Sequence, residues 1–275
     1  MNWKYLILAC CAVGMLHAQS PAAPTAFEVA TIKPSADCGP GARRGGPMGP
    51  GRLSMGCTTL QILIQTSDTF QNNHPRRLQI VGAPKWIETD QYDIDAKAEG
   101  AASVGQMAGP MLRTLLEDRF KLKMHVETRQ LPVYFLTVAK SGSKLQPVQP
   151  GSCVPIDLSH MTATPPAPGQ TPPCGRQMIN RNGTDMAMDV SGLSVADFSA
   201  QALAGRLDRP VIDKTGLTAL FDFHLQFAPD NGAAADSAAP SIFTAVQEQL
   251  GLKLSPDTGP VEVLVVDHIE KPSEN

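Results

Sequence analysis

An internal repetition constrains the fold of this chain more than any other feature of its sequence. Two segments, 79–98 and 207–227, each contain a short apolar run, a turn and a stretch in which apolar and polar residues alternate. Strict alternation is typical of a β-strand that buries one face. The downstream sequences also match at nearly constant spacing, so that Phe120 aligns with Leu250 and Pro132 with Pro260. These matches predict an internal duplication.

The duplication predicts an α+β fold made of two pseudo-repeated lobes, each a small mixed sheet with two helices on one face. The first lobe is expected to cover residues 26–140 and the second residues 183–275. Between them, residues 141–182 are rich in proline, threonine and glycine and show no periodicity, which indicates an insertion. Each lobe would end in a hairpin, within residues 121–140 in the first and 252–269 in the second.

Four helices are expected from apolar residues that recur three and four positions apart. Ser194 and Asp197 form a capping box at the start of the third helix, and Gly251 ends the fourth. The apolar positions of the four helices are Leu60, Leu63 and Ile64; Leu112, Leu115 and Leu116; Val195, Phe198 and Ala202; and Ile242, Val246 and Leu250.

The first 18 residues have the pattern of an export signal. Lys4 supplies a positive charge, residues 5–16 are apolar, and Ala18 is the small residue before the expected cleavage. This apolar stretch is shorter than the roughly 20 residues of a membrane-spanning helix. Lipid attachment at Cys10 is an alternative. We therefore expect an exported chain, periplasmic or extracellular, with no membrane span after the signal is removed.

Four cysteines remain once the signal is removed, and an even number in an exported protein indicates disulfides. We favour bonds between Cys38 and Cys57 and between Cys153 and Cys174, because each would close a Gly- or Pro-rich loop on itself. A zinc site needs tighter ligand spacing than these cysteines have, so no metal is expected.

Charge and motifs narrow the classes of ligand. The net charge of −3 gives no basic footprint, so a nucleic-acid partner is not expected. No dinucleotide fingerprint, phosphate-binding loop, haem motif or calcium loop occurs, and we expect no cofactor. The loop 38–52 contains three arginines, including Arg43 and Arg44. It is interpreted as a solvated loop, with contact to an anion or a polysaccharide as the alternative.

Few histidines in this sequence are candidates for catalysis. His125 and His224 occupy polar positions of alternating strands, which favours solvent-facing side chains over catalytic ones. Asp267 and His268 could join a serine in a triad, but no nucleophile motif such as Gly-x-Ser-x-Gly occurs.

Paired carboxylates are the other candidate chemistry, since two of them suffice for glycoside hydrolysis. Glu88 with Asp90, or Asp93 with Asp95, have a suitable density along the chain. Asp93 recurs as Asp222 at the equivalent position of the repeat. An active site seldom appears twice in one chain, so the recurrence favours a structural role for these two aspartates.

Long segments of the chain resemble a family of exported, soil-associated bacterial proteins of unknown function. They are VGAPKWIETDQYDIDAKA, MLRTLLEDRFKLKMHVETRQLPVYFLTVAKSGSKL, LDRPVIDKTGLTALFDFHLQFAP and GPVEVLVVDHIEKPSEN. The resemblance implies secretion and a shared fold, and it carries over no activity. Related domains are attached to membrane metallopeptidases similar to beta-lactam sensors, which implies a sensory or partner-binding role. The zinc motif of those peptidases, His-Glu-x-x-His, is absent. Residues 186–269 also resemble the short domain of secretins and TonB-dependent receptors that mediates protein contacts.

These observations favour a non-catalytic extracytoplasmic binding or assembly module. Its partner would be an envelope protein, a peptide or a polysaccharide, bound at exposed sheet edges or in a groove between the lobes. The alternatives are a secreted hydrolase of a glycan, ester or cell-wall substrate, and a sensor domain linked to a membrane metallopeptidase. The residues expected at the rim of the groove are Trp86, Tyr92, Phe221, Arg43 and Arg44.

Overall fold

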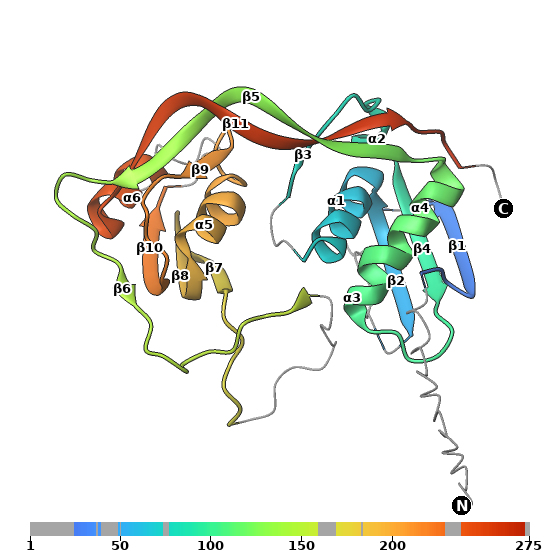
Figure 1. The fold of residues 1–275 in the computed structure, drawn as a ribbon, viewed down its shortest axis with the longest axis horizontal. Coiled ribbons are helices and arrows are strands. Elements are labelled where there is room, and N and C mark those ends of the chain that lie inside the picture. Colours follow the sequence, from blue (N-terminus) through green and yellow to red (C-terminus); the bar gives the residue numbers. More distant parts are fainter. Residues whose placement is uncertain are drawn as a thin grey trace, which may run out of the picture.

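The computed structural model describes residues 25–36, 38–39, 49, 51–73, 77–158, 169–182, 184–228 and 238–272. The expected export signal, together with Arg43 and Arg44, lies outside these residues. Within them the chain forms helices and three sheets, which confirms the α+β class (Figure 1). The sheets differ from the expected pair of mixed sheets, because two are antiparallel and the third is shared between both halves of the chain.

The first sheet is antiparallel, with β1 (Val29–Pro34), β4 (Gln91–Lys97) and β2 (Arg52–Thr59) in that spatial order. Alternation along β4 sets its faces as expected, because Tyr92, Ile94 and Ala96 are buried while the residues between them face outward. The inner face packs in one apolar cluster with residues of the helices α1 (Leu60–Gln71) and α4 (Leu112–Phe120).

The helices of the first half begin at polar caps. Thr59 accepts the N–H of Ile62 at the start of α1, and a reciprocal capping box joins Ser103 and Gln106 at α3 (Val104–Gln106). A π-helical turn, η1 (Met107–Met111), leads from α3 into α4. Here Gly109 allows close approach, since a Cβ atom would lie 2.9 Å from the backbone nitrogen of Gln71. Between α1 and β4 lie β3 (Gln79–Val81) and α2 (Trp86–Thr89).

The second sheet has the spatial order β6 (Gln146–Pro147), β10 (Leu220–Phe227), β8 (Asp185–Ser194) and β7 (Arg176–Asn182), and it is antiparallel throughout. Residues of α5 (Val195–Asp197), the π-helical η3 (Phe198–Leu203) and α6 (Ile242–Leu250) pack with its inner face. The segment 141–182, expected as an aperiodic insertion, supplies both edge strands of this sheet. The hydroxyl of Ser194 accepts the N–H of Asp197 and donates to the carboxylate of that residue, so Ser194 caps α5 without the reciprocal backbone bond of the expected capping box. The helix end at Gly251 is confirmed.

The third sheet replaces the two expected hairpins, which are wrong. The strands β5 (Lys123–Val138) and β11 (Leu252–His268) are each continuous and pair antiparallel with each other along their length. At opposite ends of this two-stranded ribbon, β3 adds parallel to β11 and β9 (Val211–Asp213) adds parallel to β5. Pro132 and Pro260, which align in the repeat, lie on the exposed middle of the ribbon. Proline has no backbone N–H to donate. This is tolerated there because neither β3 nor β9 pairs with the middle of the ribbon.

The ribbon crosses from one core to the other (Figure 1). Leu264 and Val266 of β11 belong to the apolar cluster of the first half, whereas Leu136, Leu252 and Leu254 belong to that of the second. Val126 of β5 is 49% exposed. It pairs with Leu264 of β11. At this level β3 occupies the other side of β11, and β5 is the edge strand of the sheet.

Both expected disulfides are formed. Cys38 is bonded to Cys57 and Cys153 to Cys174, with Cα–Cα distances of 5.6 and 4.9 Å. Two disulfides are consistent with an oxidising compartment outside the cytoplasm. Within the ranges given above, no helix is long and apolar enough to cross a membrane.

Candidate functional site

The outer face of the second sheet carries a row of side chains that crosses three strands. Met178 of β7 lies opposite Asp189 of β8, which lies opposite His224 of β10. Residues directly opposite each other in an antiparallel pair share a face. This face points away from the core, because the alternate residues Met188 and Val190 are buried.

His224 and Asp189 form a close pair on this face. The imidazole Nδ1 lies 2.7 Å from Oδ1 of Asp189, and each side chain is about half exposed. The expected polar-face position of His224 is confirmed. An exposed contact of this kind contributes at most about 1 kcal/mol to stability. His125 makes a similar exposed pair with Asp267, at 2.8 Å.

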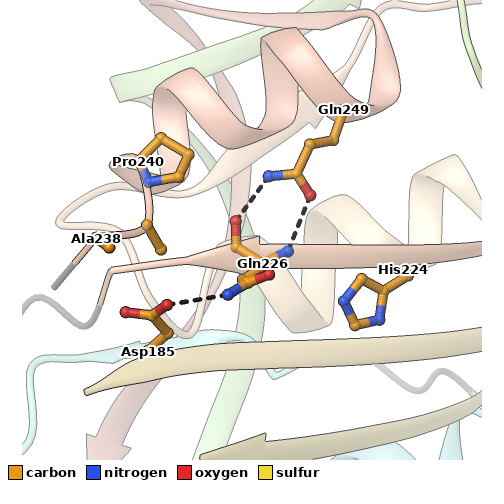
Figure 2. Close-up of a pocket in the computed structure, with 7 residues that line it drawn as sticks. Asp185, His224, Gln226, Ala238, Pro240 and Gln249 are labelled. Carbon is orange, nitrogen blue, oxygen red and sulfur yellow. Dashed lines mark hydrogen bonds between the residues drawn. The ribbon is translucent and has the colours of Figure 1, made fainter. Parts of the chain in front are cut away.

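A shallow pocket of about 260 Å³ opens beside His224 (Figure 2). Its polar groups form hydrogen bonds with one another beside the unpaired edge of β10. The amide of Gln249 accepts the backbone N–H of Gln226 at 2.9 Å and donates to its carbonyl oxygen at 2.7 Å, as a neighbouring strand would. The side chain of Gln226 in turn donates to Asp185 at 2.9 Å. The lining residues are Asp185, His224, Gln226, Ala238, Ala239, Pro240 and Gln249.

The pocket brings an imidazole, a carboxylate and two amides together. None of the residues described as lining it is a serine, threonine or cysteine. His224 could act there as a base, with Asp189 as its orienting partner. Among the residues that the structure describes, no group of three or more His, Cys, Asp or Glu side chains could hold a metal ion.

The recurring aspartates brace the backbone at equivalent bulges. Asp93 accepts the backbone N–H of Cys57 at 2.9 Å, and Asp222 accepts that of Gly192 at 2.7 Å. In each sheet the neighbouring strand has one extra residue at this point, and the donor has a positive φ, +48° at Cys57 and +66° at Gly192. These contacts support the structural interpretation of the two residues. Asp95 accepts a hydrogen bond from the hydroxyl of Ser54, with an Oγ–Oδ1 distance of 2.6 Å.

The residues expected at the rim of an inter-lobe groove do not come together. Tyr92 and Phe221 are each 3% exposed and belong to different apolar clusters. Trp86 is half-buried and stacks on Phe120 of the first cluster at a centroid distance of 6.5 Å. Arg43 and Arg44 fall outside the described residues. Ligand binding by this set stays a prediction, and burial leaves Tyr92 and Phe221 little surface with which to contact a ligand.

Lys271 in the C-terminal segment contacts two residues of the first half. Lys271 bonds Asp90 at 2.6 Å, and its Nζ lies 5.5 Å from the ring centroid of Trp86. The hydrogen bond from Lys271 lowers the pKa of Asp90, and the same bond raises the pKa of Lys271. Burial, with the charge of Asp90 nearby, raises the pKa of Tyr92. Asp90, a candidate for paired-carboxylate chemistry, therefore has a structural partner.

Strand β7 is an open edge that the sequence did not reveal. Among the described strands it pairs only with β8. Two apolar side chains stand exposed on it, Met178 at 52% and Ile179 at 43%. Its two arginines, Arg176 and Arg181, are exposed as well. The run RQMINRN has neither a regular apolar period nor a turn motif that would predict a strand. Only its burial and pairing in the structure identify it as one.

Residues 69–269 match a family described as "protein of unknown function (DUF3738)". The chain belongs to this family. No curated protein and no solved structure matches the chain. The part of the chain shared with DUF3738 contains β7, the His224 pocket, the Cys153–Cys174 bond and the whole ribbon. It begins within α1, so β1 and β2 precede it.

Proposed function

We propose that this DUF3738 chain is a non-catalytic binding or assembly module that works outside the cytoplasm. It takes an extended segment of another polypeptide by adding that segment as a strand to its second sheet. The open outer edge of β7, with apolar and cationic side chains exposed along it, is the observation that carries this proposal. An edge strand offers unpaired N–H and C=O groups, which are a template for another chain.

The hydrogen-bonding direction along β7 follows from one contact. Gly175 donates its N–H to the carbonyl of Gly192 in β8 at 2.9 Å. Backbone groups of successive strand residues point to opposite sides, and the β7–β8 register has no shift. Gln177, Ile179 and Arg181 therefore bond toward β8, whereas Arg176, Met178 and Asn180 direct their N–H and C=O groups to the open side.

The proposal includes a doubled architecture, with two lobes related by an ancestral duplication. The paired bulges support it, because Asp93 with Cys57 and Asp222 with Gly192 make the same contact in each antiparallel sheet. In both sheets the bulged strand leads directly into a capped helix, at Thr59 and Ser194. Export is supported by the two disulfides and by the signal-like first 18 residues.

A proline substitution in β7 tests strand addition. Asn180→Pro removes an outward N–H and leaves the bonds to β8 in place, while Asn180→Thr keeps the N–H and serves as the matched control. The purified chain and both variants would be used to capture partners from an envelope extract, after circular dichroism shows equal melting temperatures. We expect a partner recovered with the chain and with Asn180→Thr to be lost with Asn180→Pro. Equal recovery with Asn180→Pro would contradict the proposal.

The second candidate is hydrolysis at the His224 pocket, favoured by the 2.7 Å contact between His224 and Asp189 beside that pocket. A panel of glycan, ester and peptide substrates tests it. Turnover that falls with both His224→Ala and Asp189→Asn would establish catalysis and overturn the non-catalytic proposal. Asp222→Asn is a poor probe of this site, because Asp222 holds the bulge at Gly192.

A further inference from the structure

The side chains of β7 indicate the chemistry of the segment it accepts. Arg176 and Arg181 stand near the two ends of the strand, and neither forms an ion pair with any residue that the structure describes. Between them, Met178 faces outward in the row with Asp189, while Ile179 lies on the side of the core next to Met188. The open edge therefore presents an apolar centre flanked by two cations.

The charge of β7 argues against a second copy of the same chain as its partner. The strand contains two arginines and no acidic residue. Antiparallel pairing of β7 with itself would gather four arginines in one two-stranded ribbon without a carboxylate on either strand to offset them. Like charges across an edge are a device by which proteins prevent self-pairing. The charge that complements this edge is negative.

We infer that β7 accepts an extended peptide in which two acidic residues, five positions apart, enclose an apolar pair. This inference rests on the proposed function and names the partner's chemistry. The pattern is acidic, any, apolar, apolar, any, acidic, with the apolar pair opposite Met178 and Ile179 and the acidic residues opposite Arg176 and Arg181. It reads the same in both chain directions.

The faces of the two strands agree with this pattern. Side chains alternate along a strand, so Arg176 shares the outer face with Met178, and Arg181 shares the inner side with Ile179. Two positions five residues apart in the peptide also fall on opposite faces. Each acidic residue then meets its arginine on the same face of the extended sheet, at about 17 Å from the other pair.

Fluorescence polarisation tests the inference with defined probes. The first probe is a labelled peptide of serine and threonine that carries two glutamates five positions apart around two valines. The second probe is identical except that lysines replace the glutamates. We expect the purified chain, with both disulfides formed, to bind the glutamate peptide about tenfold or more tightly than the lysine peptide. Added salt should narrow that difference, because exposed pairs are screened.

Variants of β7 assign the binding to this edge. Arg176→Gln together with Arg181→Gln should remove the preference for glutamate, and Asn180→Pro should abolish binding of both peptides. Arg129→Gln, which changes an arginine on β5 already paired with Glu127, is the matched control and should leave binding unchanged.

Three results would overturn the inference. One is equal binding of the two peptides by the chain, and another is undiminished preference in the double arginine variant. The third is a β7 dimer in sedimentation analysis that dissociates in Asn180→Pro, which would assign the edge to a second copy. If the glutamate peptide fails while an envelope partner is still lost with Asn180→Pro, strand addition stands and only the acidic chemistry falls.

Discussion

The carboxylate of Asp222 accepts the buried backbone N–H of Gly192 over 2.7 Å, at a bulge in β8 that lies against a disulfide. This bulge changes the register between β8 and β10, so it fixes which residues stand opposite each other further along. The row from Met178 through Asp189 to His224 lies in the part of the sheet where the shifted β8–β10 register applies. A contact remote from the proposed edge thus sets the alignment of the sheet that carries the edge.

Asp222→Ala is expected to destabilise the fold, because it leaves the N–H of Gly192 without its acceptor in a buried position. The loss should be about 1–3 kcal/mol in the free energy of unfolding, measured by urea denaturation. Asp189→Ala, which removes an exposed partner of His224 on the same face, should cost under about 1 kcal/mol. Equal losses in the two variants would contradict the bracing role of Asp222.

Gly192→Ala is expected to be more destabilising than a substitution at any open glycine of positive φ. A Cβ atom at Gly192 would lie 2.7 Å from Sγ of Cys153, and its φ is +66°. Gly100→Ala is the control, since its φ is +72° and nothing lies within 4 Å of the added atom. We expect about 1–2 kcal/mol for Gly100→Ala from the backbone alone, and a further 1–3 kcal/mol or so for Gly192→Ala from overpacking. Thermal unfolding of both variants checks the order.

The pair of Asp90 and Lys271 predicts an acid-sensitive contact at the C-terminal segment. The hydrogen bond lowers the pKa of Asp90 below its usual 3.8. A carboxyl group with a lowered folded-state pKa adds stability above its unfolded-state pKa, and that stability is lost as pH falls through the folded-state value. Melting temperatures between pH 2 and 7 should therefore fall less steeply at the acid end for Asp90→Asn than for the chain itself. Lys271→Gln, which removes the hydrogen-bond donor to Asp90, should likewise make the melting temperature fall less steeply at acid pH.

Gln249→Ala is expected to open the edge of β10 at Gln226. The side-chain amide of Gln249 makes two bonds to the backbone of Gln226, one as acceptor and one as donor. Its removal should speed hydrogen exchange of the Gln226 amide and cost about 0.5–1.5 kcal/mol per bond. Gln247→Ala, on the exposed side of the same helix, should change neither quantity. Unaltered exchange at Gln226 in Gln249→Ala would show that the edge is protected by other means.

Much of the fold could be predicted because local patterns and packing agree. All four expected helices form where apolar residues recur with helical spacing, and alternation placed Tyr92 and Phe221 on strands. The two disulfides also form as expected. The hairpins were wrong because Pro132 and Pro260 suit a turn and an open two-stranded ribbon equally well, and only the pairing of distant strands separates the two.

The site was harder to predict than the fold. Tyr92 and Phe221 were placed at a groove rim, yet their own alternation puts them on the buried side with Ile94 and Leu225. The edge of β7 gave no signal, since residues 176–182 have no regular period and their exposure depends on where β8 lies. Which backbone groups remain unpaired is a property of the assembled sheet, and no short window of sequence contains it.

The ribbon of β5 and β11 has a consequence for how the molecule is made. Leu264 and Val266 near the end of β11 complete the apolar core of the first half, and β3 pairs with no other described strand. During synthesis or export, the apolar core of that half therefore stays incomplete until almost the whole chain has emerged. Neither half is a portable unit, so a gene fragment cut between them should yield material that aggregates or is degraded.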